Sequence, residues 1–159
     1  MLLAVSPSLR SEPLDSPVAQ QLIAALNAEL SARYPEAGAN HFRLDPQEVA
    51  PGRGAFLVIR EGERAIGCGA IRRLESGAAE IKRMFVVPDR RGHGVGRQVL
   101  EALEEAARGL GANRLVLETG VRQPDAIALY RKCGFTVIPA FGEYIGSELS
   151  LCMSKTLAT

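Results

Sequence analysis

The feature that most constrains the fold is a change of hydrophobic period at the segment Arg91-Gly92-His93-Gly94-Val95-Gly96. Before this segment, apolar runs separated by short turns predict an antiparallel meander of strands, at residues 55–59, 65–74 and 79–87. After it, apolar side chains recur at helical spacing, at Val95, Val99, Leu103, Ala106 and Leu110. The chain must therefore pass from a sheet into a helix through a turn made largely of glycine.

The segments before the meander predict one helix and two minor elements. Ser16 and Pro17 form a favourable helix start, and Tyr34-Pro35 should end that helix. Residues 2–5 suggest a first strand, and residues 46–49 suggest a short helix within an irregular stretch.

The segments after the glycine turn continue to alternate between strand and helix. The apolar run 115–117 is typical of a strand covered on both faces, which implies a βαβ unit with a parallel pairing. A helix from Pro124 to Gly134 follows, and then come strands at 135–138 and 149–154. We therefore expect a single domain over residues 1–159 of the α/β (α+β) class, with a mixed central sheet flanked by helices.

Charge and cysteine content argue against several classes. Nineteen basic and eighteen acidic side chains leave a net charge of +1, so no overall field draws the chain to nucleic acid or membrane. Cys68, Cys133 and Cys152 are widely spaced, so we expect reduced, mostly buried thiols and no metal. The apolar start at residues 1–5 is too short for a signal peptide or membrane span, which predicts a cytoplasmic protein.

The glycine turn has the chemistry of an anion site. Where side chains are missing, backbone N–H groups can point inward, and the following helix adds the positive end of its dipole. Arg90, Arg91 and Arg97 would add charge-assisted donors for a pyrophosphate. The alternative is a purely structural turn with solvated arginines.

Two common phosphate motifs do not match this turn. Gly96 is followed by Arg97-Gln98 instead of the lysine and hydroxyl residue of a P-loop. The dinucleotide fingerprint would need a third glycine at Arg97, and it would follow the first strand of a parallel sheet. Glu118 could imitate the acid that binds ribose in that fold, but the preceding meander argues against it.

Several motifs together resemble the GNAT superfamily of N-acetyltransferases. They are the strand over 80–87, Pro88, Arg91-x-x-Gly94-x-Gly96 and Leu129-Tyr130-x-x-x-Gly134-Phe135. The resemblance is strong from residue 55 to residue 135 and rests on the combination. It implies that the two parallel strands splay apart, so that the gap admits the pantetheine arm of acetyl-CoA.

The resemblance also implies which residues contact acetyl-CoA. Met84, Phe85 and Val86 would line the pantetheine arm, and the turn would hold the pyrophosphate through Gly92, His93, Gly94, Val95, Gly96 and Arg97. Arg91 occupies the Arg/Gln position of the family. Gln123 stands where many members carry an asparagine seven residues before the tyrosine, and it could still offer amide hydrogen bonds.

The catalytic residues implied by the resemblance are Tyr130 and Glu80. Tyr130 occupies the position of the acid that protonates the departing thiolate, although it could instead be a core aromatic. Glu80 would take the proton of the amine from the strand that leads to the turn. Regular alternation would place Glu80, Lys82, Met84 and Val86 on one face, where Lys82 could pair with Glu80.

The resulting prediction is direct acetyl transfer from acetyl-CoA to a primary amine, expected to belong to a small molecule. A protein amine acetyltransferase, a non-catalytic acyl-CoA-binding sensor and a homodimer are left open. Arg43, Arg53, Arg122 and residues 141–144 would line the acceptor pocket and favour a carboxylate-bearing molecule, unless they are solvated surface. His41 is expected at the surface, and none of the cysteines has a recognisable activating partner.

Overall fold

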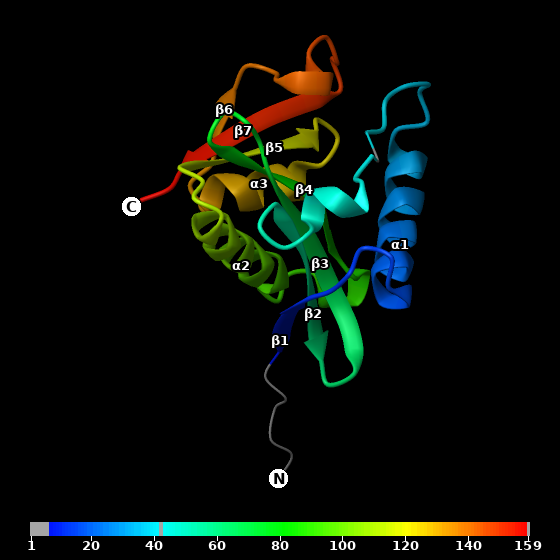
Figure 1. Ribbon diagram of the computed structural model, residues 1–159. Coiled ribbons are helices and arrows are strands. Elements are labelled where there is room, and N and C mark those ends of the chain that lie inside the picture. Colours follow the sequence, from blue (N-terminus) through cyan, green and yellow to red (C-terminus); the bar gives the residue numbers. More distant parts are fainter. Residues whose placement is uncertain (1–6, 42, 159) are drawn as a thin grey trace.

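The computed structural model describes residues 7–41 and 43–158, which form one mixed sheet covered by helices (Figure 1). The described strands lie in the order β1-β2-β3-β4-β5-β7-β6, and among them only β4 and β5 are parallel neighbours. Their bounds are Ser8–Ser11 (β1), Gly54–Glu61 (β2), Arg64–Arg73 (β3), Ala78–Val86 (β4), Arg114–Gly120 (β5), Thr136–Ile138 (β6) and Ser150–Thr156 (β7).

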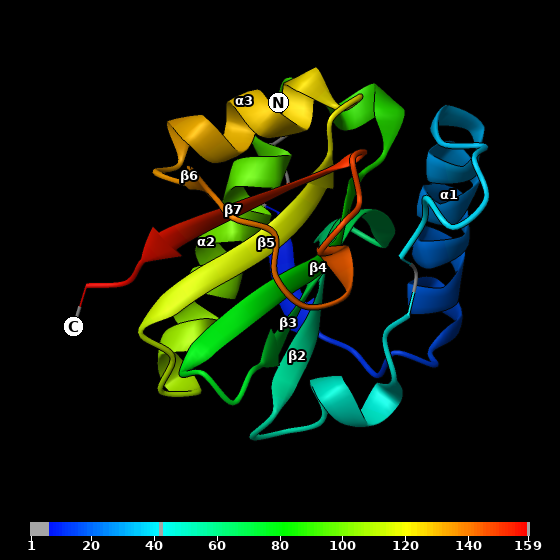
Figure 2. The ribbon, with the colours of Figure 1, turned by 90° about the horizontal axis from the view of Figure 1, so that it is seen from above.

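Helices cover both faces of the sheet, and Figure 2 shows α1 on one side with α2 and α3 on the other. The α-helices are Pro17–Arg33 (α1), Val95–Gly109 (α2) and Pro124–Lys132 (α3), and short 3₁₀ turns are Pro46–Val49 (η1), Pro88–Arg90 (η2) and Gly142–Tyr144 (η3). Leu22 and Leu26 of α1 are buried in one apolar cluster. Val99 and Leu103 of α2 are buried in a second, larger cluster. The sheet therefore lies between two apolar layers.

The predicted order of elements is confirmed, with one shift at the start. Ser16 caps α1 by accepting a hydrogen bond from the backbone N–H of Ala19 at 3.1 Å, and Pro17 is the first helical residue as expected. The meander β2-β3-β4 and the β4-α2-β5 crossover are present as predicted. The strand expected at residues 2–5 lies outside the described residues, and β1 begins at Ser8.

The parallel strands β4 and β5 separate halfway along their length. They pair from Ala78 opposite Arg114 to Ile81 opposite Leu117, whereas β4 continues to Val86 and β5 to Gly120. The second half of β4 consequently keeps β3 as its neighbour on one side and leaves its other edge open. The splay that the family resemblance implied is therefore present.

A bulge in β4 overturns the expected alternation of its side chains. Arg83 has a φ of 57°, and the pairing with β3 shifts register at this point. The extra residue moves Met84 and Val86 to the α2 side, where both pack against the larger cluster. Glu80 and Lys82 face the α1 side, so the prediction that all four share one face is wrong.

Tyr34 holds the C-terminal end of α1 against the end of β5. Its hydroxyl accepts a hydrogen bond from the backbone N–H of Arg122 at 2.8 Å, and the Arg122 guanidinium lies 5.2 Å from the ring centre. A Cβ added at Gly120 would lie 1.9 Å from the Tyr34 hydroxyl oxygen. Gly120 therefore leaves the space that the Tyr34 side chain fills.

Replacing Gly120 with alanine should displace Tyr34 and lower the free energy of unfolding by about 1–3 kcal/mol, as overpacking does elsewhere. Gly109→Ala is the matched control, because an added Cβ within α2 meets nothing within 4 Å. Its better helix propensity should raise stability by about 0.5–1 kcal/mol. Chemical denaturation of both variants measures the difference, and equal effects would show that the Tyr34 contact does not anchor α1.

Candidate active site

A pocket lies where β4 and β5 separate. Its walls come from α1, residues 39–41, the two splayed strands, α3 and residues 144–150. Side chains that can bind or transfer a proton gather on these walls, among them His41, Lys82, Glu118, Gln123, Tyr130 and Tyr144. The splay therefore creates a cavity lined by a carboxyl group, an ammonium group and phenols.

Glu118 and Tyr130 face this pocket from β5 and α3. Burial raises the pKa of the Glu118 carboxyl to about 7, although a hydrogen bond with Ser150 opposes the shift. Burial also raises the pKa of the Tyr130 phenol, and the charge of Glu118 adds to this effect. At neutral pH the Glu118 carboxylate can therefore accept a proton, and the Tyr130 phenol is protonated and can donate one.

The sequence prediction missed Glu118 as a proton-transfer group. A usable signal was present, because Glu118 directly follows the apolar run 115–117 of a strand predicted to be parallel. Ligands in α/β proteins bind beyond the carboxyl ends of parallel strands, and the structure places Glu118 toward that end of β5.

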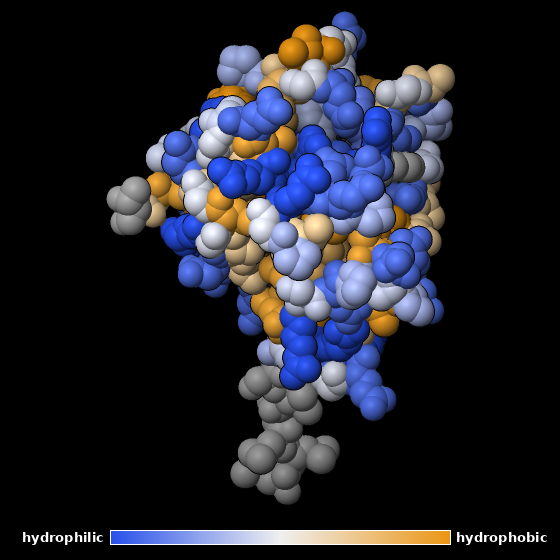
Figure 3. Space-filling model, in the orientation of Figure 1, coloured by the Kyte–Doolittle hydropathy of each residue, from blue (hydrophilic) through white to orange (hydrophobic). Residues whose placement is uncertain are grey.

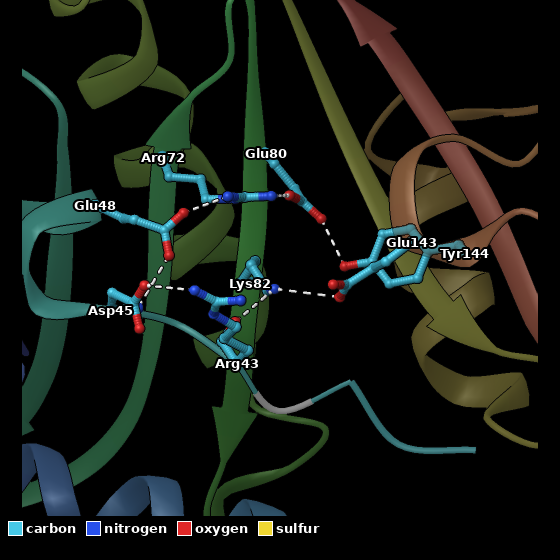
Figure 4. A network of polar contacts seen from close by, with 8 residues as sticks. All are labelled: Arg43, Asp45, Glu48, Arg72, Glu80, Lys82, Glu143 and Tyr144. Carbon is cyan, nitrogen blue, oxygen red and sulfur yellow. Dashed lines mark hydrogen bonds and ion pairs between the residues drawn. The ribbon is translucent and has the colours of Figure 1, made fainter. Parts of the chain in front are cut away.

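Glu80 is fully buried, and both of its carboxylate oxygens are engaged (Figure 4). Oε1 accepts a hydrogen bond from Nε of Arg72 at 2.8 Å, and Oε2 accepts one from the Tyr144 hydroxyl at 2.7 Å. Arg72 also pairs with Glu48, so one guanidinium serves two carboxylates. Within the described residues Glu80 does not line the pocket, and it ties β3 and β4 to η3 instead.

Lys82 does not pair with Glu80. Its Nζ donates a hydrogen bond to the carbonyl oxygen of Arg43 at 2.7 Å and lies 3.8 Å from Oε1 of Glu143. The Lys82 side chain is only 6% exposed, whereas that of Glu143 is 45% exposed. A buried ammonium group on the pocket wall thus has a carboxylate at the rim as its neighbour.

The basic residues that line the pocket are not those expected from the sequence. Arg43, Arg53 and Arg122 are exposed, and two of them form ion pairs with nearby acids. None of these three lines the described pocket, whereas Lys82 and Arg83 of β4 do. On the face seen in Figure 3, hydrophilic side chains gather over η1 and the adjoining part of the sheet.

His41 lies in the pocket wall and not, as predicted, on the open surface. The edge of its ring faces Tyr144, with the ring centres 5.0 Å apart, and Nδ1 is 3.7 Å from Oε1 of Glu143. Its buried Nε2 has no hydrogen-bond partner among residues 7–41 and 43–158. Of the predicted segment 141–144, Tyr144 is the residue that reaches the pocket.

The glycine turn gives the N-terminus of α2 an open main chain. Gly92 and Gly94 have φ values of 81° and 82°, which favour glycine, and Cβ atoms there would meet nothing within 4 Å. Gly94 is the N-cap of α2 and provides no side-chain cap for the first turn. Gly96 serves packing, because an added Cβ would lie 3.0 Å from Leu129 of α3. The turn therefore has the backbone of an anion site.

The arginines around the turn have different partners. The Arg91 guanidinium forms two hydrogen bonds with Glu29 of α1, at 2.8 and 3.0 Å, and a third with the Val86 carbonyl oxygen. Arg90 pairs with Glu61 across the adjacent hairpin. Within residues 7–41 and 43–158, the one ion pair of Arg97 is an exposed contact with Glu101, one helical turn away. Such a pair is weak, so Arg97 is the arginine most easily redirected to a phosphate.

The predicted cofactor residues divide into side-chain and main-chain candidates. Met84 and Gln123 line the pocket. Phe85 and Val95 are buried in the two apolar clusters, so they could contact a cofactor only through their main chain. His93 is exposed at the turn.

Other kinds of site find no support in the described part of the chain. Residues 7–41 and 43–158 contain no group of histidine, cysteine and acidic side chains arranged to hold a metal ion. None of the helices found there is long and apolar enough to cross a membrane. The cysteines are free, and burial raises the pKa of the Cys68 thiol to about 12. Such a thiol is a poor nucleophile at neutral pH.

Comparison with known proteins gives one consistent result. The acetyltransferase (GNAT) family matches residues 19–135. An IAA acetyltransferase from Azospirillum brasilense is 47% identical over 149 residues, which cover 93% of this chain and 95% of that protein. A crystal structure from Klebsiella pneumoniae, of a protein classed among the acyl-CoA N-acyltransferases, has a TM-score of 0.82 and 34% identity, covering 97% and 99% of the two chains.

A more distant structure shares the fold alone. The PaiA N-acetyltransferase from Thermoplasma acidophilum, solved in complex with coenzyme A, has a TM-score of 0.71 at 16% identity and covers 96% of this chain and 99% of its own. The splayed parallel pair, the glycine turn and these similarities agree. The chain belongs to the GNAT family and is an N-acetyltransferase.

Proposed function

We propose that this chain transfers the acetyl group of acetyl-CoA directly to a primary amine of a small molecule. The observation that carries the proposal is the pocket in the β4/β5 gap, where Glu118 and Tyr130 face the same space. The coenzyme A bound to the Thermoplasma protein supports the donor. The name of the Azospirillum relative, an IAA acetyltransferase, supports a small-molecule acceptor.

The residues present fit acetyl-CoA. The main chain of Gly92 to Gly96 and the side chain of Arg97 would hold the pyrophosphate at the N-terminus of α2. The unpaired edge of β4 offers main-chain donors and acceptors to the pantetheine amides, with Met84 and Gln123 beside them. Bound in this way, acetyl-CoA supplies an activated acetyl group at the gap between the strands.

The two proton transfers can be assigned to facing walls. The amine must lose a proton to attack, and Glu118 can accept it because its pKa of about 7 leaves it largely ionised above neutrality while still basic. Tyr130 can give its proton to the sulfur that leaves. Glu80, the base implied by the family resemblance, has both oxygens engaged, so the arrangement favours Glu118 for this role.

Replacing Gly94 with valine should weaken acetyl-CoA binding strongly, because a β-branched residue at positive φ would distort the turn and cover its N–H groups. Gly111→Val is the matched control at the other end of α2, since Gly111 has a φ of 79° and equally open surroundings. Both variants should lose about 1–2 kcal/mol of stability. Calorimetry with acetyl-CoA separates them, and equal affinities would remove the turn from the binding site.

Glu118→Gln should abolish the limb of the kcat/KM profile near pH 7, whereas Glu80→Gln should keep that limb. Stability provides a second readout. Because the pKa of Glu118 is raised in the folded state, wild-type stability falls as pH rises from about 4.5 through about 7. Glu118→Gln has no carboxyl group to titrate at this position. Its free energy of unfolding relative to that of the wild type should therefore increase by about 3 kcal/mol by pH 8. A limb that disappears only in Glu80→Gln would return the base role to Glu80.

Tyr130→Phe should lower the maximal rate by about 10²–10⁴-fold, the usual contribution of a positioned acid, with little change in acetyl-CoA affinity. Tyr144→Phe is the matched control: this buried phenol donates a hydrogen bond to the Glu80 carboxylate, so the change should cost about 1.5–3 kcal/mol of stability without that loss of rate. The rates are compared in single turnover, so that slow product release cannot hide the effect. Full activity of Tyr130→Phe would assign Tyr130 to the core.

A further inference from the structure

The acceptor side of the pocket can be located once acetyl-CoA is placed beside the glycine turn. On the opposite side, the walls are the end of α1, residues 39–41, and the segment that carries Tyr144 and Ser150. Of the charged side chains that line the described pocket, Lys82 and Arg83 are basic and Glu118 is acidic. An acceptor therefore meets fixed charges of both signs.

Within the described residues, the buried Lys82 ammonium group donates no hydrogen bond to a carboxylate. Its hydrogen bond goes to a neutral carbonyl oxygen, that of Arg43, and the Glu143 carboxylate lies at 3.8 Å, beyond hydrogen-bond distance. The buried carboxylate of Glu80 is bound to Arg72 and Tyr144 instead (Figure 4). Burying an ammonium group is costly unless an anion compensates it, so this position favours an incoming anion.

Glu143 has the properties of an exchangeable neighbour. Its side chain is 45% exposed, and its Oε1 lies between Lys82 at 3.8 Å and Nδ1 of His41 at 3.7 Å. Neither contact is a hydrogen bond, and the exposed Glu143 carboxylate keeps access to solvent, so little holds it in place. The buried Nε2 of His41 also has no partner within the described residues. A carboxylate on the substrate could displace Glu143 and gain direct hydrogen bonds from Lys82.

Lys82 and Glu118 occupy facing positions. Ile81 and Leu117 form the last paired position of β4 and β5, so Lys82 and Glu118 are the next residue on each strand. Paired strands lie about 4.8 Å apart, and the separation grows beyond the last pair. A compact molecule with an amine at Glu118 and a carboxylate at Lys82 would match both charges. An α-amino acid carries these two groups on one carbon.

We infer, on the basis of the function proposed above, that the acceptor is an α-amino acid whose carboxylate is bound by Lys82 while its amine faces Glu118. Leu26, Leu30 and Leu149 line the same pocket and favour an apolar side chain on that amino acid. In the reaction Glu118 takes a proton from the amine and the nitrogen bonds to the acetyl carbon. The carbon–sulfur bond breaks, the sulfur takes the proton of Tyr130, and the second proton that the nitrogen loses passes to the Tyr130 oxygen.

The test compares L-leucine, L-methionine and L-phenylalanine with their primary amides as acceptors of the acetyl group. The reaction is followed by the release of the thiol from acetyl-CoA. Lys82→Met should lower kcat/KM for the acids by about 30-fold or more, the effect of removing one partner of a buried charge pair, and should change the amides little. For each acceptor, the kcat/KM of the wild type is divided by that of the variant. This ratio removes the effect of the different amine pKa values of the acids and the amides. An equal loss for acids and amides would overturn the inference.

Glu143→Gln supplies a second, independent variant that should fold because the residue lies at the rim. It should raise kcat/KM for the acids and leave the amides unchanged, since the competing carboxylate is gone. No gain for the acids, or thiol release only with amines that lack a carboxylate, would refute the amino acid assignment while leaving acetyl transfer intact. Binding of acetyl-CoA without thiol release on any amine would instead refute the proposed function.

Discussion

The structure depends on the place where β4 and β5 cease to pair. The pairing of these two strands ends at Ile81 and Leu117. The bulge at Arg83 then interrupts the regular alternation of β4 side chains between the two faces of the sheet. A sheet interior normally satisfies its main-chain groups, so an open edge there requires another partner. The same separation creates the pocket and places the glycine turn beyond it. The proposed cofactor site, acceptor site and proton-transfer groups all depend on this one interruption of the strand pairing.

A partly buried network of ion pairs and hydrogen bonds lies beside the interruption. Arg72 binds Glu48 of η1 and Glu80 of β4, and Glu80 in turn accepts a hydrogen bond from Tyr144 of η3. Breaking such a network leaves uncompensated charge at the buried Glu80, so its members fix one arrangement of four elements, β3, β4, η1 and η3. A carboxylate held this firmly is suited to positioning a wall. Glu118 of β5, and not Glu80, is the glutamate that lines the described pocket.

Much of the fold could be predicted from the sequence because the signals are local. The Ser16 cap, the glycine turn and the change of period at Val95 depend on neighbouring residues, and each is found where expected. The bulge could not be predicted in this way, because Arg83 carries a side chain at a φ of 57°, where glycine would have given a signal. The position of Glu118 against β4 depends on strand order, and the burial of Lys82 depends on tertiary packing.

Some walls of the pocket belong to the packed core of the domain, and others do not. The turn, α2 and the pairing of β3 with β4 share one apolar core, so a change there affects several elements at once. Residues 39–41 and 144–150 belong to connecting segments that reach the pocket from outside that core. Insertions and substitutions in such segments are tolerated far better than changes in packed elements. The outer wall of the pocket can therefore be reshaped without disturbing the sheet that carries Lys82 and Glu118.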